Sequence, residues 1–158
     1  MKEKIKTRED LKKVLEKLKE EGKKVVFTNG CFDLIHVGHT RYLEEAKKLG
    51  DILIVAVNSD QSVKAIKGDK RPLMPEEERA EVLSALQCVD LVVIFHEADP
   101  LNLISLLKPD VLVKGGDWGE DSIIGRDVVE SIGGKVVRIP EIGGASTSGI
   151  IDKIVNRK

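Results

Sequence analysis

The sequence predicts a single α/β domain in which a five-stranded parallel sheet carries helices on both faces. Five short apolar runs, rich in β-branched residues, alternate with stretches of helical periodicity along the chain. Such runs are typical of strands that are buried on both faces, and strands that alternate with helices pair in parallel through right-handed crossovers. The chain has 158 residues, which suits one domain, and no linker or internal repeat divides it.

The first predicted element is an amphipathic helix over residues 8–21. Its apolar residues recur at i, i+3, i+4 and i+7 from Leu11, and Gly22 ends the pattern. We treat residues 1–22 as an N-terminal helical extension of one domain that spans residues 1–158. The predicted strands cover residues 25–27, 52–57, 91–95, 111–113 and 136–139. The remaining helices are predicted near residues 38–49, 76–87, 100–108, 124–132 and 147–156. This order of elements predicts a Rossmann-like fold.

The composition excludes several classes of function. Charged residues make up 34% of the chain and the formal net charge is −1, so neither nucleic acid nor an anionic membrane is an expected partner. Two cysteines without a CxxC pair indicate no disulfide framework. No apolar run is long enough for a membrane span or a signal-peptide core, and we therefore expect a cytoplasmic protein. The GxGxxG fingerprint is absent, which argues against hydride transfer. A Walker A loop is also absent.

The segment at residues 28–39, with the sequence TNGCFDLIHVGH, joins the first predicted strand to the next helix. Corners of this kind, at the carboxyl end of a parallel strand, are where α/β proteins bind ligands. His36 and His39 are three residues apart and share a face at the helix start, beside backbone N–H groups at the positive end of the helix dipole. This arrangement indicates a phosphate site. The alternatives are a zinc site, with Cys31 or Asp33 as a third ligand, and a purely structural role.

A charged segment follows the second predicted strand. It begins with Asn58 and Asp60 and brings four cations within eight residues, of which Lys70 and Arg71 are the last two. Such a run is usually a solvated loop, but its Gly and Pro residues also suit a flap that closes over a polyphosphate. Arg79 lies one turn inside the helix that follows, where its position calls for a role beyond pairing with the helix dipole.

Two later segments also follow predicted strands. The fourth strand ends in Lys114-Gly115-Gly116-Asp117-Trp118, whose glycines let a ligand approach the backbone closely. Trp118, the single tryptophan, can stack on a base or cover an edge of the protein. The last predicted helix is preceded by Ser146-Thr147-Ser148, whose hydroxyls either cap that helix or form a second anion site.

The motif Gly30-Cys31-Phe32-Asp33, followed by His36-x-Gly38-His39, resembles the HxGH signature of a nucleotidyltransferase superfamily. That superfamily includes cytidylyltransferases, pantetheine-phosphate adenylyltransferase and class I aminoacyl-tRNA synthetases. From residue 24 onward, nearly the whole chain is similar to one subfamily, the adenylyltransferase domain of the bifunctional heptose kinase/adenylyltransferase. The combination of KGGDW with the late STS is far more specific for this subfamily than HxGH alone. Residues 1–22 fall outside the resemblance or at its edge.

The resemblance implies a transfer of AMP from ATP to a sugar 1-phosphate, D-glycero-β-D-manno-heptose 1-phosphate, which gives ADP-heptose for lipopolysaccharide and releases pyrophosphate. A phosphate monoester has a second pKa of about 6, so the acceptor is already a nucleophile at pH 7 and needs no general base. The implied partners are ATP and the sugar phosphate. Mg²⁺ would bridge phosphate oxygens and need few protein ligands, so no metal site on the protein is expected. A homodimer is also implied.

The resemblance further implies a role for each site residue. The groups that contact the triphosphate during catalysis would be His36, His39, Lys70, Arg71 and Arg79. The residues that bind the nucleotide would be Thr28, Asn29, Gly30, Cys31, Phe32, Gly38, Lys114, Gly115, Asp117, Trp118, Ser146, Thr147 and Ser148. The residues that face the sugar phosphate or the metal would be Asp33, Asn58 and Asp60.

Three alternatives remain from the sequence. The first is a CTP-dependent glycerol-3-phosphate cytidylyltransferase, or a choline or ethanolamine relative. Those proteins carry an Arg five residues before the late Ser, where this chain has Glu141, and they differ at Lys114, so both positions favour ATP and heptose. Ser148 stands where Thr is commoner in both families, but it keeps the hydroxyl. The second alternative is a nucleotide-binding sensor without catalysis, and the third is a thiol enzyme that uses Cys31 without an adjacent resolving cysteine.

Overall fold

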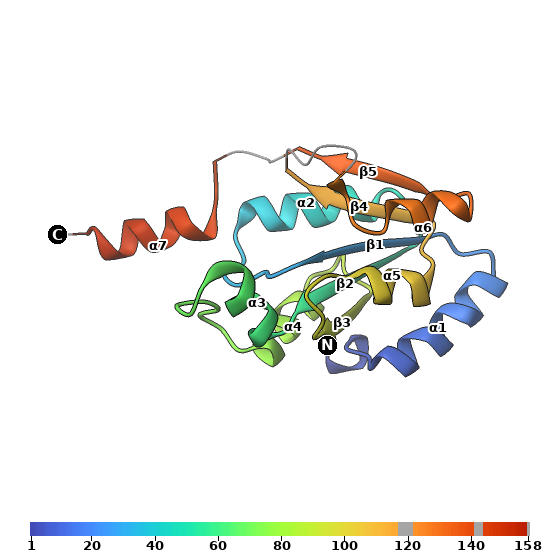
Figure 1. The fold of residues 1–158 in the computed structure, drawn as a ribbon, viewed down its shortest axis with the longest axis horizontal. Helices are drawn as coiled ribbons and strands as arrows, with labels where there is room; N and C mark the ends of the chain where they lie inside the picture. The colour runs from blue at the N-terminus through green and yellow to red at the C-terminus, as the bar shows by residue number, and fades with distance from the viewer. Residues whose placement is uncertain (117–121, 141–143, 158) are drawn as a thin grey trace.

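The computed structural model describes residues 1–116, 122–140 and 144–157, which form an α/β fold (Figure 1). Its sheet has five parallel strands in the order β3-β2-β1-β4-β5. The strands are β1 Val25–Gly30, β2 Ile52–Asn58, β3 Leu91–Phe95, β4 Val111–Gly115 and β5 Lys135–Ile139. The predicted parallel sheet is confirmed. β1 runs past its apolar residues because its pairing with β2 continues to Gly30, which faces Val57.

The helices are α1 Arg8–Glu20, α2 Val37–Lys47, α3 Asp60–Lys67, α4 Glu76–Ser84, α5 Leu101–Leu107, α6 Arg126–Ser131 and α7 Thr147–Val155, with a 3₁₀ turn η1 at Lys2–Lys4. All the predicted helices are present. The prediction was wrong for α3, which occupies the first part of the segment interpreted as a charged loop. Ser59 caps α3 by accepting a hydrogen bond from the backbone N–H of Ser62, and Gly68 ends it with a φ of 93°. The cations of α3 lie on the outer side of a short amphipathic helix rather than in an open flap.

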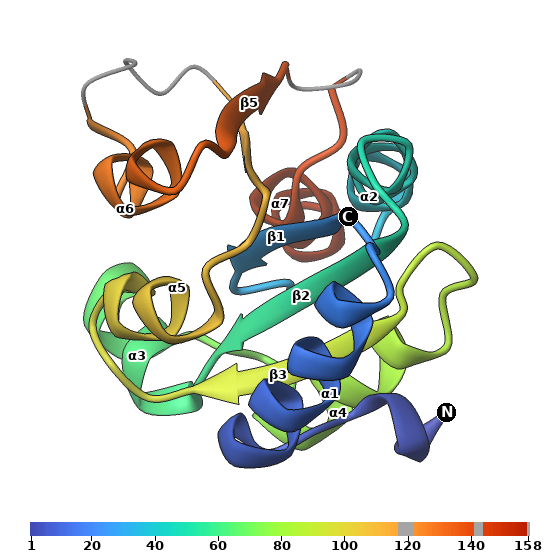
Figure 2. The ribbon, with the colours of Figure 1, turned by 90° about the vertical axis from the view of Figure 1, so that its right-hand side faces the viewer.

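Different helices cover the two faces of the sheet, as predicted. On the face that we call the α5 face, α1, α5 and α6 pack over alternate strand residues such as Phe27 and Leu112. On the face that we call the α2 face, α2 and α4 pack over the intervening residues such as Val26 and Val113. Figure 2 shows α5 and α2 on opposite sides of β1. Because successive strand residues point to opposite faces, the same alternation decides which polar groups meet at the carboxyl edge of the sheet.

The N-terminal residues are packed into the domain. Leu11 and Leu15 of α1 are buried in the core of the α5 face. Ile5 pairs with Val92 as a parallel bridge along the outer edge of β3, and Arg8 forms an ion pair of 2.5 Å with Glu97. Residues 1–22 therefore complete the core and one sheet edge.

At the other end of the chain, α7 points away from the sheet (Figure 1). It has no buried residue, and Ile154 and Val155 are 65% and 74% exposed. Within the described ranges, the structure has no helix with the length and apolar character that a membrane span requires.

Candidate functional site

The corner between β1 and α2 has a backbone conformation that its neighbours impose. Phe32 has a φ of 47°, which is costly for a bulky residue. Its ring lies edge-on to His39, with centroids 5.4 Å apart, and a Cβ atom on Gly30 would lie 2.9 Å from the same ring. Gly30 is therefore required for space, and the buried Phe32 ring holds one side of the histidine pair.

His36 and His39 stack on each other, with ring centroids 3.9 Å apart and an interplanar angle of 25°. The Nδ1 atoms of both are buried and have no hydrogen-bond partner among the described residues. Burial, and then the adjacent His36 ring, lower the pKa of His39 to about 4 and outweigh a smaller raising effect of the Leu34 backbone, so His39 is neutral at pH 7. Because a buried N–H without an acceptor is costly, we expect the proton on Nε2 of each ring, from which it can be donated to a ligand.

The N-terminus of α2 is open to an anion. His36 is the N-cap residue, but no side chain caps the helix. A Cβ atom on Gly38 would lie 3.0 Å from the His36 ring and 3.2 Å from the carbonyl oxygen of Ala145. The glycine thus lets the histidine ring and the segment before α7 approach the first turn of α2. Free backbone N–H groups at a helix start favour phosphate.

The late hydroxyl motif lies against the same corner. The hydroxyl of Thr147 donates to the carbonyl oxygen of Leu34 at 3.3 Å. Ser146 caps α7 by accepting a hydrogen bond from the backbone N–H of Gly149 at 3.0 Å, and Ser148 is exposed. Segments more than a hundred residues apart in the chain therefore meet beside the histidine pair, as a shared phosphate site requires.

Asp33 ties the corner to the segment that follows α3. Its buried carboxylate accepts hydrogen bonds from Arg71 Nε at 2.6 Å and from the backbone N–H groups of Leu73 and Met74 at 2.9 and 3.0 Å. Burial alone would raise the pKa of Asp33, but these hydrogen bonds outweigh it and lower the pKa. Asp33 was predicted to face the sugar phosphate or the metal. In the structure its carboxylate accepts hydrogen bonds from protein donors.

Arg79 lies in the interior, with a side chain that is 0% exposed. Its Nε donates to the carbonyl oxygen of Met74 at 2.9 Å, and its two terminal nitrogens donate to the Cys31 carbonyl oxygen at 2.5 Å and to Asp60 Oδ1 at 2.7 Å. The resemblance implied that Arg79 contacts the triphosphate. In the structure its guanidinium group has three protein acceptors, which connect the corner, the start of α3 and the segment between α3 and α4, residues 68–75, which we call the flap segment.

The other predicted residues divide between the surface and the sheet edge. Lys70 is exposed, and Arg71 is engaged by Asp33 as described. Asn58 is buried, and its Nδ2 donates to the Ser62 hydroxyl at 2.9 Å. Asp117, Trp118 and Glu141 lie outside the described residues.

Two polar pairs lie on opposite faces at the ends of β1 and β4. Thr28 and Tyr42 share a hydrogen bond of 2.7 Å on the α2 face, and a Cβ atom on Gly115 would lie 3.2 Å from the Tyr42 ring. On the α5 face, Lys114 Nζ donates to Asn29 Oδ1 at 2.5 Å. Burial lowers the pKa of Lys114 to about 8. Sequence reasoning named Asn29 and Lys114 as nucleotide-binding residues but not as a pair, because no local pattern connects them.

The zinc alternative finds no third ligand in the described part of the chain. No group of three His, Cys, Asp or Glu side chains there is placed to hold a metal ion. The carboxylate of Asp33 is occupied by Arg71 and two backbone N–H groups. Burial raises the pKa of the Cys31 thiol, which disfavours the thiolate that a metal ligand or a nucleophile would require.

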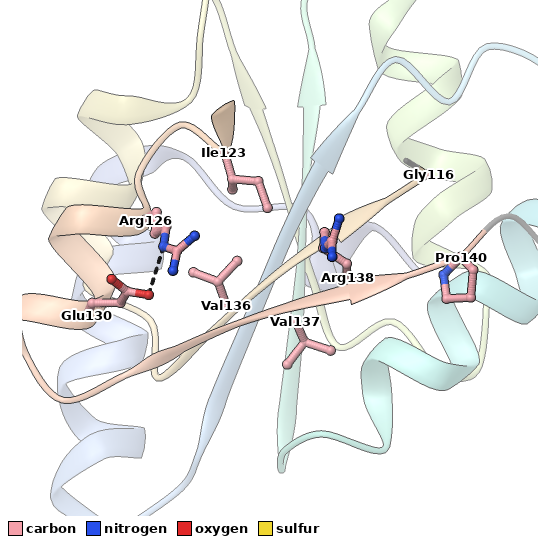
Figure 3. Close-up of a pocket in the computed structure, with 8 residues that line it drawn as sticks. All are labelled: Gly116, Ile123, Arg126, Glu130, Val136, Val137, Arg138 and Pro140. Atoms are coloured by element: carbon pink, nitrogen blue, oxygen red, sulfur yellow. Dashed lines mark hydrogen bonds and ion pairs between the residues drawn. The ribbon is translucent and has the colours of Figure 1, made fainter. Parts of the chain in front are cut away.

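A cavity of about 500 Å³ lies between α6 and β5 (Figure 3). Its lining includes Val136 and Arg138 of β5 and an ion pair of 2.9 Å between Arg126 and Glu130 of α6. Of its lining residues, Gly116 belongs to the glycine-rich segment that follows β4, and none is among the residues assigned above to catalysis or to binding of the nucleotide or the acceptor.

Comparisons with known proteins indicate the family of the chain. A sequence model described as cytidylyltransferase-like matches residues 27–144. The bifunctional protein HldE of Syntrophotalea carbinolica is 53% identical over 154 residues, which is 98% of this chain and 31% of that protein. HldE of Geobacter metallireducens is 56% identical over 152 residues, again 31% of that protein. The chain thus spans about a third of the length of these curated relatives. Since 154 of the 158 residues are matched, most of residues 1–22 lie inside the resemblance, contrary to our expectation.

Solved structures with similar folds include two informative ones. The lipopolysaccharide core biosynthesis protein from Thermoplasma volcanium has 35% identity and a TM-score of 0.66, over 77% of this chain and 100% of that one. Pantoate-beta-alanine ligase from Francisella tularensis has 18% identity and a TM-score of 0.65, over 92% of this chain and 69% of that one. The second similarity concerns the fold alone.

Proposed function

Because the chain belongs to the cytidylyltransferase-like family of nucleotidyltransferases, we propose that it transfers AMP from ATP to D-glycero-β-D-manno-heptose 1-phosphate. The products are ADP-heptose and pyrophosphate. The observation that carries this proposal is the stacked pair of His36 and His39 at an uncapped helix start, with Thr147 of the late motif beside it. The identity to HldE proteins over nearly the whole chain supports the choice of nucleotide and sugar.

The proposed reaction is an in-line displacement at the α-phosphorus of ATP. An oxygen of the sugar phosphate forms the new P–O bond, and the bond from the α-phosphorus to the bridging oxygen of pyrophosphate breaks. Since the acceptor is largely dianionic at pH 7, no proton has to be removed. The protein therefore has to position the reactants and stabilise the negative charge that builds on the leaving group.

The triphosphate is held by donors from two helix starts. His36 and His39 donate from Nε2, and the free N–H groups of α2 add backbone donors. Ser146 and Thr147 contribute from the start of α7. Gly38 keeps these donors close together, because a Cβ atom there would lie 3.0 Å from the His36 ring, which is tighter than ordinary van der Waals contact. A set of fixed donors needs no reorganisation during the reaction, which is the main source of such stabilisation.

The remaining site residues have supporting roles in this proposal. Lys70 and Arg71 contribute positive charge from the flap segment, while Asp33 and Arg79 are positioning residues that fix this segment to the corner. The backbone of Gly30, Cys31 and Phe32 borders the α-phosphate. In this proposal the base and ribose contact Thr28 and Gly115, and the resemblance assigns Asp117 and Trp118, outside the described residues, to the same nucleotide. Asn58 and Asp60 lie toward the acceptor side, with Ser148 at the rim. Mg²⁺ bound to ATP would supply positive charge at the phosphate oxygens and would need few protein ligands.

A substrate panel tests the proposal. ATP, CTP and GTP are each combined with heptose 1-phosphate and with glycerol 3-phosphate, in the presence of Mg²⁺, and the release of pyrophosphate is measured. The proposal expects the fastest turnover with ATP and heptose 1-phosphate. Comparable or faster turnover with CTP and glycerol 3-phosphate would replace it with the cytidylyltransferase alternative, and binding of ATP without turnover of any acceptor would favour a sensor.

We further propose that the protein is a homodimer. The exposed apolar residues of α7, Ile154 and Val155, are consistent with burial in an assembly. Light scattering of the purified protein measures its mass directly. A mass of one chain at micromolar concentration would contradict this proposal without affecting the proposed reaction.

A further inference from the structure

A lysine ammonium group lies at the carboxyl edge of the sheet, apart from the histidine pair. Lys114 precedes the last residue of β4, is partly buried, and donates from Nζ to Asn29 Oδ1 at 2.5 Å. Across residues 1–116, 122–140 and 144–157, no carboxylate forms an ion pair with it. An ammonium group has three N–H donors, so two of them have no acceptor in that part of the chain. A partly buried cation without a counter-ion is costly for a folded protein.

The sheet separates this cation from the histidine pair. Along β1, Thr28 contacts Tyr42 on the α2 face, so the next residue, Asn29, points to the α5 face. Along β4, the Cβ position of Gly115 faces Tyr42, so Lys114 also points to the α5 face. The histidine pair belongs to α2. The edge of the sheet therefore offers two separate anion-binding groups, one toward each face.

The geometry of displacement at phosphorus requires two such groups. The attacking and the leaving oxygen lie roughly in line on opposite sides of the phosphorus atom. In the function proposed above, the leaving pyrophosphate is held at the start of α2. The acceptor must then approach from the other side of the α-phosphorus, which is where a cation on the α5 face would meet it.

We propose that Lys114, oriented by Asn29, binds the phosphate of the acceptor and selects for a phosphorylated sugar. This inference rests on the proposed function. The dianionic phosphate supplies a counter-charge that no described residue provides for the ammonium group, and Asn29 is a positioning residue that fixes one of the three N–H directions. The lowered pKa of Lys114, about 8, agrees with an ammonium group that has lost water on burial and that has no counter-ion among the described residues.

Lys114→Met removes the charge and keeps the length of the side chain, and Lys114→Arg restores a cation. For Lys114→Met we expect the KM for heptose 1-phosphate to rise about 10- to 100-fold, as for the loss of a hydrogen bond to a charged group, while the KM for ATP stays within about twofold. Its Tm should equal or exceed that of the wild type, because a partly buried charge that no described carboxylate compensates is gone. Lys114→Arg should recover part of the acceptor affinity.

Asn29→Asp is the matched second variant, since it gives Lys114 a carboxylate partner of nearly the same shape. We expect a higher Tm and a higher KM for the acceptor, because Asp would compete with the phosphate for the cation. A rise in the KM for ATP equal to that for the acceptor in Lys114→Met would assign Lys114 to the nucleotide. A lower Tm of Lys114→Met, with both KM values unchanged, would make Lys114 structural. Either outcome overturns the inference.

The pH dependence provides a readout that a structural role would not change. Below its pKa of about 8 Lys114 is protonated, so kcat/KM for the acceptor should fall above about pH 8 in the wild type and stay flat there in Lys114→Met. Among the described residues, the titratable group that influences Lys114 is Cys31, whose own pKa is raised by burial, so its thiol stays neutral until higher pH. The same profile in both proteins would contradict the inference.

Calorimetry separates this inference from the proposed function. Heptose 1-phosphate is titrated into wild type and Lys114→Met, each saturated with the unreactive analogue α,β-methylene-ATP. Weaker binding by Lys114→Met supports the inference even if turnover fails, and equal binding overturns it even if ADP-heptose is formed. The absence of turnover with every acceptor in the substrate panel would overturn the proposed function instead.

Discussion

Replacing Asp33 by Asn tests how strongly the corner depends on one buried charge. The Asp33 residue is 2% exposed, and its carboxylate accepts hydrogen bonds from Arg71 Nε, Leu73 N and Met74 N at 2.6, 2.9 and 3.0 Å. The Asn side chain has the same shape, but its NH₂ group cannot accept a hydrogen bond. At least one of the three donors therefore loses its acceptor, and Arg71 loses its counter-ion.

The expected cost follows from these contacts. A buried donor without an acceptor costs about 1–3 kcal/mol, and removing one partner of a buried ion pair costs about 3–5 kcal/mol. Arg71 is 16% exposed, so water offsets part of this loss. We expect the free energy of unfolding to fall by about 2–4 kcal/mol, which lowers the Tm by about 5–15 °C for a chain of this size. Circular dichroism during heating measures the shift.

An exposed ion pair of similar length provides the control. Lys48 and Glu45 are 2.5 Å apart, against 2.6 Å for Arg71 and Asp33, but their side chains are 67% and 48% exposed. Glu45→Gln should leave the Tm unchanged, because exposed pairs contribute little. A Tm for Asp33→Asn within about 1 °C of the wild type would refute the reasoning. Because the pKa of Asp33 is lowered in the folded state, its contribution is present at pH 7 and is lost as acid protonates the carboxyl group. The difference between the two proteins should therefore shrink below about pH 4.

Four further predictions follow from the same contacts. His39→Ala should lower kcat about 100- to 1000-fold, as for a single oxyanion donor, with little change in the dissociation constant of ATP, and His39→Asn should recover part of the lost kcat. Steady-state kinetics and a binding titration measure both quantities, and a near-normal kcat of His39→Ala would contradict this role. The unfolded chain binds a proton at His39 below its usual pKa of 6.5 whereas the folded chain does so near 4, so urea unfolding should show stability falling from pH 7 to 5, and a fall of equal size in His39→Asn would contradict this cause. Cys31→Ala should keep at least about a tenth of the activity, since it loses only packing, and activity at background level with a normal circular dichroism spectrum would make the thiol chemical. Leu11→Ala should cost about 2–5 kcal/mol in urea unfolding, because Leu11 is 0% exposed, and a cost below about 0.5 kcal/mol would make the N-terminal helix dispensable.

The sheet was predictable because each strand contains a short run of apolar residues in the sequence. The run at 91–95 matches β3 in full, since each of its residues is apolar and β3 is buried along most of its length. The helix α3 was not predicted because its closely spaced cations are also typical of a charged loop, although Ser59 and Gly68 mark its two ends. The tight corner was also predictable, because Asn29-Gly30 and the two histidines lie within one short segment.

The polar contacts of the site were not predictable from local patterns. Arg79 was expected over the triphosphate, but its three acceptors come from Cys31, Asp60 and Met74, of which Cys31 is 48 positions away. Only the tertiary fold brings these oxygens together. The pairing of Lys114 with Asn29 likewise depends on β4 lying beside β1, which sequence order alone does not specify.

Phosphorus-31 NMR of the complete reaction tests the central claim most directly. The wild-type protein is mixed with ATP, Mg²⁺ and heptose 1-phosphate, and the phosphorus resonances are followed with time. Attack at the α-phosphorus predicts that pyrophosphate and a sugar nucleotide with two phosphorus resonances appear in equal amounts, while the ATP and sugar phosphate signals decline together. Formation of ADP with orthophosphate or a sugar bisphosphate would place the attack at the γ-phosphorus and would contradict the assignment of the site.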